Sequence, residues 1–157
     1  GLSATVAEPQ ALARWLVDQN PPGEMADIVT VEGGAKPEIT ILETEEHVPW
    51  AGHSARYAIP DIYEAIKRHR TTLLFVNTRS QAELLFRELW RINEDNLPIA
   101  LHHGSLDVGQ RRRVEKAMET NSLSAIVATS TLDLGIDWGD VDLVIHVGAP
   151  KGASRLA

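Results

Sequence analysis

Beyond residue 60 the sequence alternates between short apolar runs and longer amphipathic segments, and this alternation constrains the fold more than any other feature. The apolar runs are continuous, which is typical of strands that are buried on both faces. The amphipathic segments carry apolar residues at helical spacing. Strands and helices in regular alternation indicate an α/β protein with a parallel sheet and helices on both of its faces. We predict strands at Thr72–Val76, Pro98–His102, Ser124–Ala128 and Val141–Val147, and helices at Pro60–His69, Ser80–Ile92 and Val108–Thr120.

The first 56 residues are organised differently and less regularly. Ala7–Asp18 has helical spacing, with Trp15 at a core position, and Trp90 has core spacing in the later helix. The β-branched run Asp27–Glu32 and the run Glu38–Glu43 predict two strands, separated by the linker Gly33–Pro37. From Thr44 to Arg56 no period is visible, which favours a long irregular connection.

The composition is that of an ordinary globular protein. Of the 157 residues, 43% are apolar and 24% are charged, and the chain has no cysteine. The absence of cysteine excludes disulfides and thiolate chemistry and favours a reducing compartment. No apolar run approaches the ~20 residues of a membrane span, and Gly1–Thr5 lacks the basic region of a signal peptide. We therefore expect a cytoplasmic chain with no membrane partner.

A net charge of -7 argues at first against nucleic-acid binding, which depends on Lys and Arg. The charge is unevenly distributed, however. Residues 21–55 contain one Lys and seven Asp or Glu residues, which gives -6, and residues 1–20 add -1. From residue 56 to the end, 13 basic and 13 acidic residues cancel. The acidity therefore belongs to one stretch, and the regular α/β part is neutral.

Polar residues and glycines follow three of the predicted strands. The three loops are Asn77–Ser80, His102–Ser105 and Thr129–Thr131. In parallel α/β sheets ligands bind outside the carboxyl ends of the strands, and the free N–H groups of a helix start attract anions. The three loops together predict a site for several phosphates. Ser and Thr are also the usual N-cap residues, so capping without any ligand is the alternative at each loop.

Three adjacent arginines, Arg111–Arg113, lie near the start of the helix that follows the His-Gly loop. Such a run is usually a solvated face, but Arg also binds phosphate oxygens through two N–H groups. The position one turn beyond His103–Gly104 favours phosphate contact for at least one of them.

We predict no metal site and no complete catalytic site in this chain. The acidic residues at 133, 137, 140 and 142 lack the spacing of a calcium loop, and His102–His103 have no third ligand at metal spacing. The sequence contains no G-x-x-x-x-G-K-[ST] loop, no acidic Walker B pattern, no G-x-S-x-G elbow and no H-E-x-x-H motif. Hydrolysis of a nucleoside triphosphate by this chain alone is therefore not expected.

Several segments resemble the motifs of superfamily-two helicases, in order and over nearly the whole chain. Gly1–Thr5 is similar to motif III, Leu73–Arg79 to motif IV, His102–Leu106 with Arg111 to the His-Gly segment and its downstream arginine, and Val127–Asp137 to motif V. Together with Trp138–Val144 and Gly148–Gly152, these segments are most similar to the large helicase-related (Lhr-type) group of DEXH-box helicases, which includes the ligase-associated enzymes.

The resemblance implies one RecA-like lobe of a two-lobed motor, a three-layer α/β domain that shares an ATP site and a nucleic-acid strand with a second lobe. Residues 1–32 would be the tail end of the first lobe, 33–37 the linker, and 38–157 the second lobe, ending before motif VI. The parent protein would be an ATP-dependent helicase. This chain alone would be inactive, because the Walker motifs and motif VI lie outside it.

The resemblance also implies roles for individual residues. Ser3 and Thr5 would couple ATP hydrolysis to unwinding, and Gly135 and Asp137 would face the nucleotide. Magnesium would be held mainly by the first lobe. The strand, single-stranded DNA or an RNA:DNA hybrid, would be bound without sequence preference. The phosphates would be contacted by Thr78, Arg79, His103, Gly104, Arg111, Thr129 and Ser130.

The alternative function is a non-motor α/β module that binds nucleic acid or another protein, with the acidic residues 21–55 as its docking surface. For residues 1–32 we expect mobility or non-native packing, because a strand at Asp27–Glu32 would lack a sheet of its own.

Overall fold

The computed structural model describes residues 6, 8–18, 22–30, 38–44, 55–129 and 140–149. The chain divides into two compact units, one comprising Gly1–Ile41 and Ala153–Ala157 and the other Leu42–Gly152. The second unit contains the sheet.

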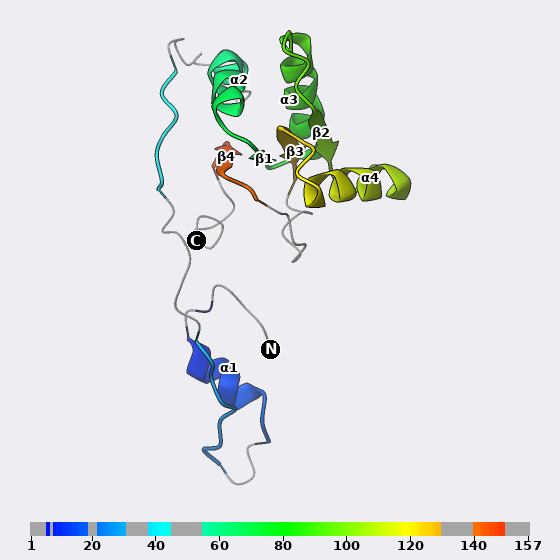
Figure 1. The fold of residues 1–157 in the computed structure, drawn as a ribbon. Helices are drawn as coiled ribbons and strands as arrows, with labels where there is room; N and C mark the ends of the chain where they lie inside the picture. Colours follow the sequence, from blue (N-terminus) through cyan, green and yellow to red (C-terminus); the bar gives the residue numbers. More distant parts are fainter. Residues whose placement is uncertain are drawn as a thin grey trace. The chain divides into compact units, whose positions relative to one another are not determined.

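The described part of the second unit is built on a four-stranded sheet in the order β2-β3-β1-β4 (Figure 1). All three strand pairs are parallel, with Thr72 opposite Ala125 on one side and Leu143 on the other. The predicted α/β class with a parallel sheet is confirmed. The strands are β1 (Thr72–Val76), β2 (Ile99–His102), β3 (Ala125–Ala128) and β4 (Leu143–Val147).

The helices begin where the sequence supplies a start signal. A short 3₁₀ helix, η1 (Ala55–Ala58), leads into α2 (Ile59–Arg68), which has Pro60 in its first turn. Thr78 and Gln81 form a reciprocal capping box at the start of α3 (Arg79–Arg91). Asp107 caps α4 (Val108–Glu119) through the Gly109 amide. The three predicted helices of this unit are confirmed, with ends that differ by about one residue.

Alternate residues of the strands face two separate apolar clusters, so the sheet is the middle layer of three. Leu74, Val76 and Val127 pack with the buried residues of α2 and α3. On the opposite face, Leu73 and Ile126 pack with Met118 of α4. Figure 1 accordingly shows α2 and α3 on one side of the sheet and α4 on the other. Ala82, Leu85 and Leu89 of α3 are buried, and Phe86 is partly buried against the same cluster.

Asp142 fixes the sheet at the edge where the strands begin, which we call the amino edge. Its carboxylate accepts hydrogen bonds from the backbone N–H groups of Arg70 at 3.0 Å and Thr71 at 2.8 Å. Partial burial alone would raise the pKa of the Asp142 carboxyl, but these backbone hydrogen bonds outweigh it and hold the pKa below its usual value. Arg70 also pairs with Asp140 at 2.9 Å. These two acidic residues thus support the start of β1.

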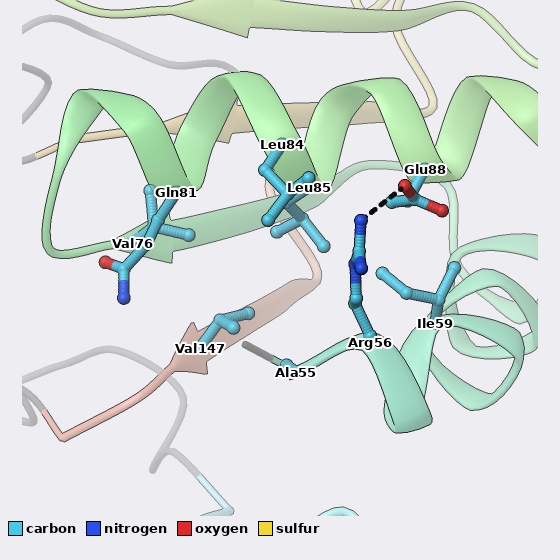
Figure 2. A pocket seen from close by; sticks show the side chains of 9 residues that line it. All are labelled: Ala55, Arg56, Ile59, Val76, Gln81, Leu84, Leu85, Glu88 and Val147. Atoms are coloured by element: carbon cyan, nitrogen blue, oxygen red, sulfur yellow. Dashed lines mark hydrogen bonds and ion pairs between the residues drawn. The ribbon is translucent and has the colours of Figure 1, made fainter. Parts of the chain in front are cut away.

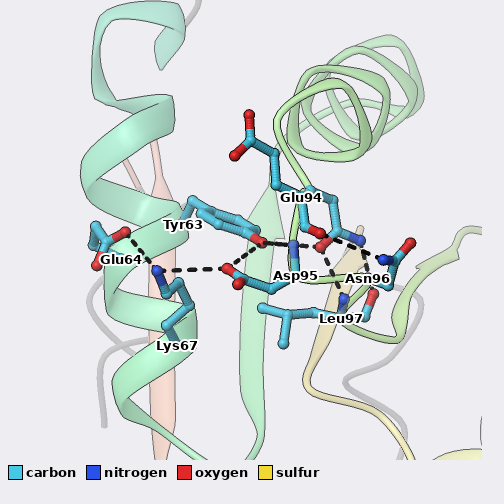
Figure 3. Close-up of polar contacts among 8 residues, drawn as sticks. Tyr63, Glu64, Lys67, Glu94, Asp95, Asn96 and Leu97 are labelled. Carbon is cyan, nitrogen blue, oxygen red and sulfur yellow. Dashed lines mark hydrogen bonds and ion pairs between the residues drawn. The ribbon is translucent and has the colours of Figure 1, made fainter.

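A buried tyrosine joins α2 to the loop between α3 and β2 (Figure 3). The Tyr63 hydroxyl lies 3.0 Å from Asn93 Oδ1 and 3.1 Å from Asp95 Oδ2, and it accepts a hydrogen bond from the Asp95 N–H at 3.3 Å. Lys67, one turn further along α2, pairs with Asp95 at 3.4 Å. Burial raises the pKa of Tyr63, so its hydroxyl stays protonated and available as a donor. The network fixes the loop that leads from α3 into β2.

The first unit contains one helix among its described residues, α1 (Pro9–Trp15), of which only Ala13 is buried. The strands predicted at Asp27–Glu32 and Glu38–Glu43 are wrong for every described residue, because residues 27–30 and 38–43 form no strand. A strand exists only where a neighbour completes its hydrogen bonds, and none is paired with these segments in the described structure. Glu32 lies outside the described residues.

The core positions predicted for two tryptophans are also wrong. Trp15 is 80% exposed, and Trp90 is 47% exposed although it packs edge to face against Phe86. Periodic spacing places a residue on one face of a helix, but it does not show that the face is covered. Among the described residues no helix is both long enough and apolar enough to cross a membrane.

Candidate nucleic-acid interface

The parallel sheet brings the predicted loops to one edge, which we call the carboxyl edge. Ala128, the last residue of β3, lies opposite both His102 of β2 and Phe75 of β1. The residues that follow these strands therefore emerge side by side. They include five of the predicted phosphate contacts, which are Thr78, Arg79, His103, Gly104 and Thr129.

Thr78 caps α3, as the alternative interpretation of this loop predicts. Its hydroxyl oxygen accepts a hydrogen bond from the Gln81 N–H at 3.2 Å, and the Gln81 side chain accepts one from the Thr78 N–H at 3.2 Å. Because the hydroxyl acts as an acceptor in the cap, its proton is left for a further acceptor. Capping and phosphate contact are thus compatible at this exposed residue.

Arg79, the first residue of α3, is exposed and is held by an acidic residue one turn later. Its Nε donates to Glu83 Oε1 at 3.0 Å, and the two side chains are 60% and 49% exposed. The same Glu83 oxygen lies 3.4 Å from Nε2 of His103, whose side chain is only 4% exposed. Glu83 thus lies between two of the predicted site residues. The spacing i, i+4 from Arg79 is the signal that could have identified it in the sequence.

His103 lies beneath the surface of the site. Neither ring nitrogen has a hydrogen-bond partner among the described residues. Burial lowers the pKa of His103, and the opposing effect of Glu83 does not compensate, while Arg79 and His102 lower it further. The ring is therefore neutral near pH 7. Gly104, the next residue, is exposed and presents its backbone at the surface instead.

The neighbouring histidine points to the other face of the sheet, as successive strand residues do. His102 Nε2 lies 3.1 Å from Glu115 Oε1 of α4. The two adjacent histidines therefore have different carboxylate partners on different helices, so they cannot bind one metal ion together. Nothing in the sequence distinguishes Glu115 from the other acidic residues as the partner of His102.

Arg111 differs from the two arginines that follow it. Arg112 and Arg113 are exposed, whereas Arg111 is partly buried and its Nε has no hydrogen-bond partner among the described residues. A buried guanidinium nitrogen without a partner is costly unless a ligand or water supplies an acceptor. The geometry therefore favours Arg111, within this cluster, as the residue that contacts an anion.

Thr129, which follows β3, is 9% exposed, and its N–H donates to the His102 carbonyl at 3.3 Å. Its backbone thus continues the β2–β3 pairing by one residue. The other predicted site residues, Ser3, Thr5, Ser130, Gly135 and Asp137, lie outside the described residues.

Asn77 connects the end of β1 with the loop after β4. Its side-chain Nδ2 donates to the Ala149 carbonyl at 3.0 Å. Gly148 has φ +96°, a left-handed conformation that favours glycine, whereas a Cβ there would make only an ordinary contact with the Asn77 nitrogen at 3.4 Å. Sequence reasoning placed Asn77 in a motif but did not predict this contact.

A small apolar cavity lies behind this edge, between η1, α3 and the ends of β1 and β4 (Figure 2). Its lining includes Val76 and Val147, and Arg56 reaches across it to Glu88 at 3.4 Å. The cavity volume of about 30 Å³ has room for water but not for a nucleotide. The polar residues of the carboxyl edge, rather than this cavity, form the candidate site.

Comparison with known proteins relates the chain to helicases. Residues 56–157 match the family described as helicase conserved C-terminal domain. The ATP-dependent helicase Lhr-Core of Sulfolobus acidocaldarius is 33% identical over 166 residues, which cover 99% of this chain and 18% of that protein. The Lhr helicase/uracil glycosylase of Escherichia coli is 30% identical over 199 residues, covering 96% of this chain and 12% of that protein. The chain thus spans less than a fifth of these relatives.

Solved structures show the same relationship. The Mycobacterium smegmatis helicase Lhr bound to ssDNA and AMP-PNP matches with a TM-score of 0.60 and 39% identity, covering 64% of this chain and 14% of that one. Dbp5 of S. cerevisiae bound to RNA and ADP BeF3 matches with a TM-score of 0.54 and 20% identity, covering 64% of this chain and 25% of that one. At 20% identity, the match to Dbp5 shows a similar fold and nothing more.

Proposed function

Because the chain belongs to the helicase conserved C-terminal domain family, we propose that it works as the second RecA-like lobe of an ATP-dependent nucleic-acid helicase. The resemblance to the Lhr-type group is confirmed by the relatives. The alternative of a non-motor module finds no support among them. The observation that carries the proposal is the convergence of three strand ends at one edge, where Arg79 and the Gly104 backbone are exposed.

In this proposal the carboxyl edge binds the phosphates of one nucleic-acid strand. Arg79 supplies a guanidinium, Thr78 a hydroxyl proton, and Gly104 a backbone N–H. Arg111 supplies a second guanidinium, and Thr129 and Ser130 extend the contact after β3. The burial of His103 gives its ring an indirect role in shaping the loop. Single-stranded DNA or an RNA:DNA hybrid would be bound without sequence preference, because phosphate contacts carry no base information.

The lobe division completes this proposal. Residues 1–32 would belong to a first lobe, 33–37 would be the linker, and 38–157 would form the second lobe. The exposed apolar side chains within residues 1–32 support this division, since Trp15 and Val29 are 80% and 88% exposed. Side chains of this kind are normally covered by a further part of the same structure.

ATP would bind between the lobes, with Gly135 and Asp137 on this side and Ser3 and Thr5 coupling its hydrolysis to movement. The described residues contain no cluster of three or more His, Asp or Glu side chains that could hold a metal ion. As the resemblance implies, we assign Mg²⁺ mainly to the first lobe. When bound, ATP would supply the energy that closes and reopens the lobes.

Arg79 can be tested against a matched control at the other end of the same helix. Arg79 and Arg91 are both exposed, and each pairs with a glutamate of α3 at 3.0 Å. In the full-length protein, Arg79→Ala should weaken binding of a single-stranded oligonucleotide about fivefold and reduce the slope of log K against log salt by about 0.7. Arg91→Ala at the amino edge should change neither quantity.

Fluorescence anisotropy titrations at several salt concentrations measure both quantities, and ATP hydrolysis with and without the oligonucleotide reports the coupling. Equal binding by the two variants would exclude Arg79 as a phosphate contact.

A further inference from the structure

Glu83 occupies a position at the carboxyl edge that its charge alone would disfavour. A carboxylate beside a phosphate strand repels it, yet Glu83 is one turn into α3, next to Arg79. Its Oε1 lies 3.0 Å from Arg79 Nε and 3.4 Å from His103 Nε2. One oxygen therefore contacts a residue after β1 and a residue after β2.

The contact between Glu83 and Arg79 uses only the Nε of the guanidinium. Glu83 takes the Nε–H, and within the described part of the chain it is the only side-chain partner of Arg79. The two terminal nitrogens remain for an outside acceptor. Arg binds phosphate in pairs of parallel N–H···O bonds, which require the plane of the guanidinium to be fixed. A carboxylate on Nε fixes that plane.

Glu83 also lies close to the loop that follows β2, through its contact with His103. The ring is buried and neutral, and Glu83 Oε1 lies 3.4 Å from its Nε2 without forming a hydrogen bond. The charged or titratable groups that act on the ring are Glu83 and Arg79 of α3 and His102 of β2, which itself pairs with Glu115 of α4. Gly104, whose backbone is exposed, is bonded directly to His103.

We propose that Glu83 is a positioning residue of the phosphate site: its carboxylate holds the Arg79 guanidinium and the His103 loop in register, so that both present their donors to the same nucleic-acid strand. This inference rests on the proposed nucleic-acid contact of Arg79. An ion pair as exposed as this one adds little to folding stability, so its geometric effect can be measured without unfolding the protein.

The proposal predicts a change of binding with the opposite sign to simple electrostatics. Removing a negative charge near phosphates should strengthen binding if only charge matters. If Glu83 positions Arg79, Glu83→Ala in the full-length protein should weaken binding of a single-stranded oligonucleotide about three- to fivefold. Glu83→Gln, which keeps an acceptor oxygen without the charge, should lose less. Glu94→Ala removes the same charge from an exposed residue at the amino edge and should stay within about twofold.

A double-mutant cycle with Arg79→Ala separates positioning from a general structural effect. If Glu83 acts through Arg79 as well as through the His103 loop, the loss caused by Glu83→Ala should be clearly smaller in the Arg79→Ala background than in the unaltered protein. The same loss in both backgrounds would overturn the proposal, as would stronger binding by both Glu83 variants while Arg79→Ala still weakens it. If Arg79→Ala itself has no effect, the phosphate contact of Arg79 fails, and the role of Glu83 fails with it.

Discussion

Asp142 shows how a single residue makes the stability of this fold depend on pH. The folded-state pKa of its carboxyl lies below the usual value, so the folded protein holds fewer protons there than the unfolded chain at moderately acid pH. Asp142 therefore adds to the free energy of unfolding when the pH is above the pKa that its carboxyl has in the unfolded chain. This stabilisation is lost as the pH falls through the lower pKa of the folded protein. His103, whose pKa is also lowered, adds a loss in the same direction on acidification.

A comparison with Asp142→Asn isolates the aspartate. At pH 7 the variant should have a lower free energy of unfolding, because the Arg70 and Thr71 amides lose a charged acceptor. The difference from the unaltered chain should shrink as the pH falls below about 4, where the carboxyl becomes protonated in the unfolded chain. Urea unfolding of both chains at a series of pH values measures this difference in the free energy of unfolding. A difference that is the same at every pH would mean that the charge of Asp142 contributes nothing.

At the scale of elements, the sequence predicted the strands inside the sheet and the amphipathic helices that pack against it. The strand at Thr72–Val76 has the predicted ends, because its short apolar run is covered on both faces of the sheet. The expected strand at Glu38–Glu43 is absent, because its alternation identifies a face but supplies no partner. The same limit applies to Glu83 and Glu115, whose contacts with the histidines are set by helix packing rather than by local sequence.

Helix α3 links the core to the candidate site, so its buried face can be tested separately. Leu89 is fully buried in the cluster between α3 and the sheet. Leu89→Ala should lower the free energy of unfolding by about 2–5 kcal/mol through lost contacts and the cavity left behind. Arg87→Ala, at an exposed position of the same helix, should stay within about 0.5 kcal/mol. Denaturant titrations of the two variants give the comparison, and similar small losses in both would place Leu89 outside the core.

For the whole molecule, the two units differ in how completely they bury their apolar residues. Both core clusters lie between Ala55 and Val147, whereas the described apolar residues of the first unit are mostly exposed. The second unit therefore contains its own core. That residues 1–32 are mobile or packed in a non-native way stays a prediction, which hydrogen exchange can test.

A shortened chain that begins at residue 42 tests this independence. Its urea midpoint and thermal unfolding temperature should match those of the 157-residue chain, because every residue of the two core clusters is retained. A chain that begins at residue 60 is the control: it loses Ala58 and Ile59 from the core and should unfold earlier. A clear loss of stability in the first variant would show that residues 1–41 contribute to the core.

The hydrogen bonds that join β1 and β4 at both of their ends affect how the two strands resist force. Asp142 joins the strands where they begin, through the Arg70 and Thr71 amides, and Asn77 joins them where they end, through the Ala149 carbonyl. When two parallel strands are pulled along their length, all of the hydrogen bonds between them are strained at once. When the strands are pulled apart from one end, the hydrogen bonds break one after another. Because the pair is joined at both ends, separating β4 from β1 must first break the hydrogen bonds of Asp142 or that of Asn77.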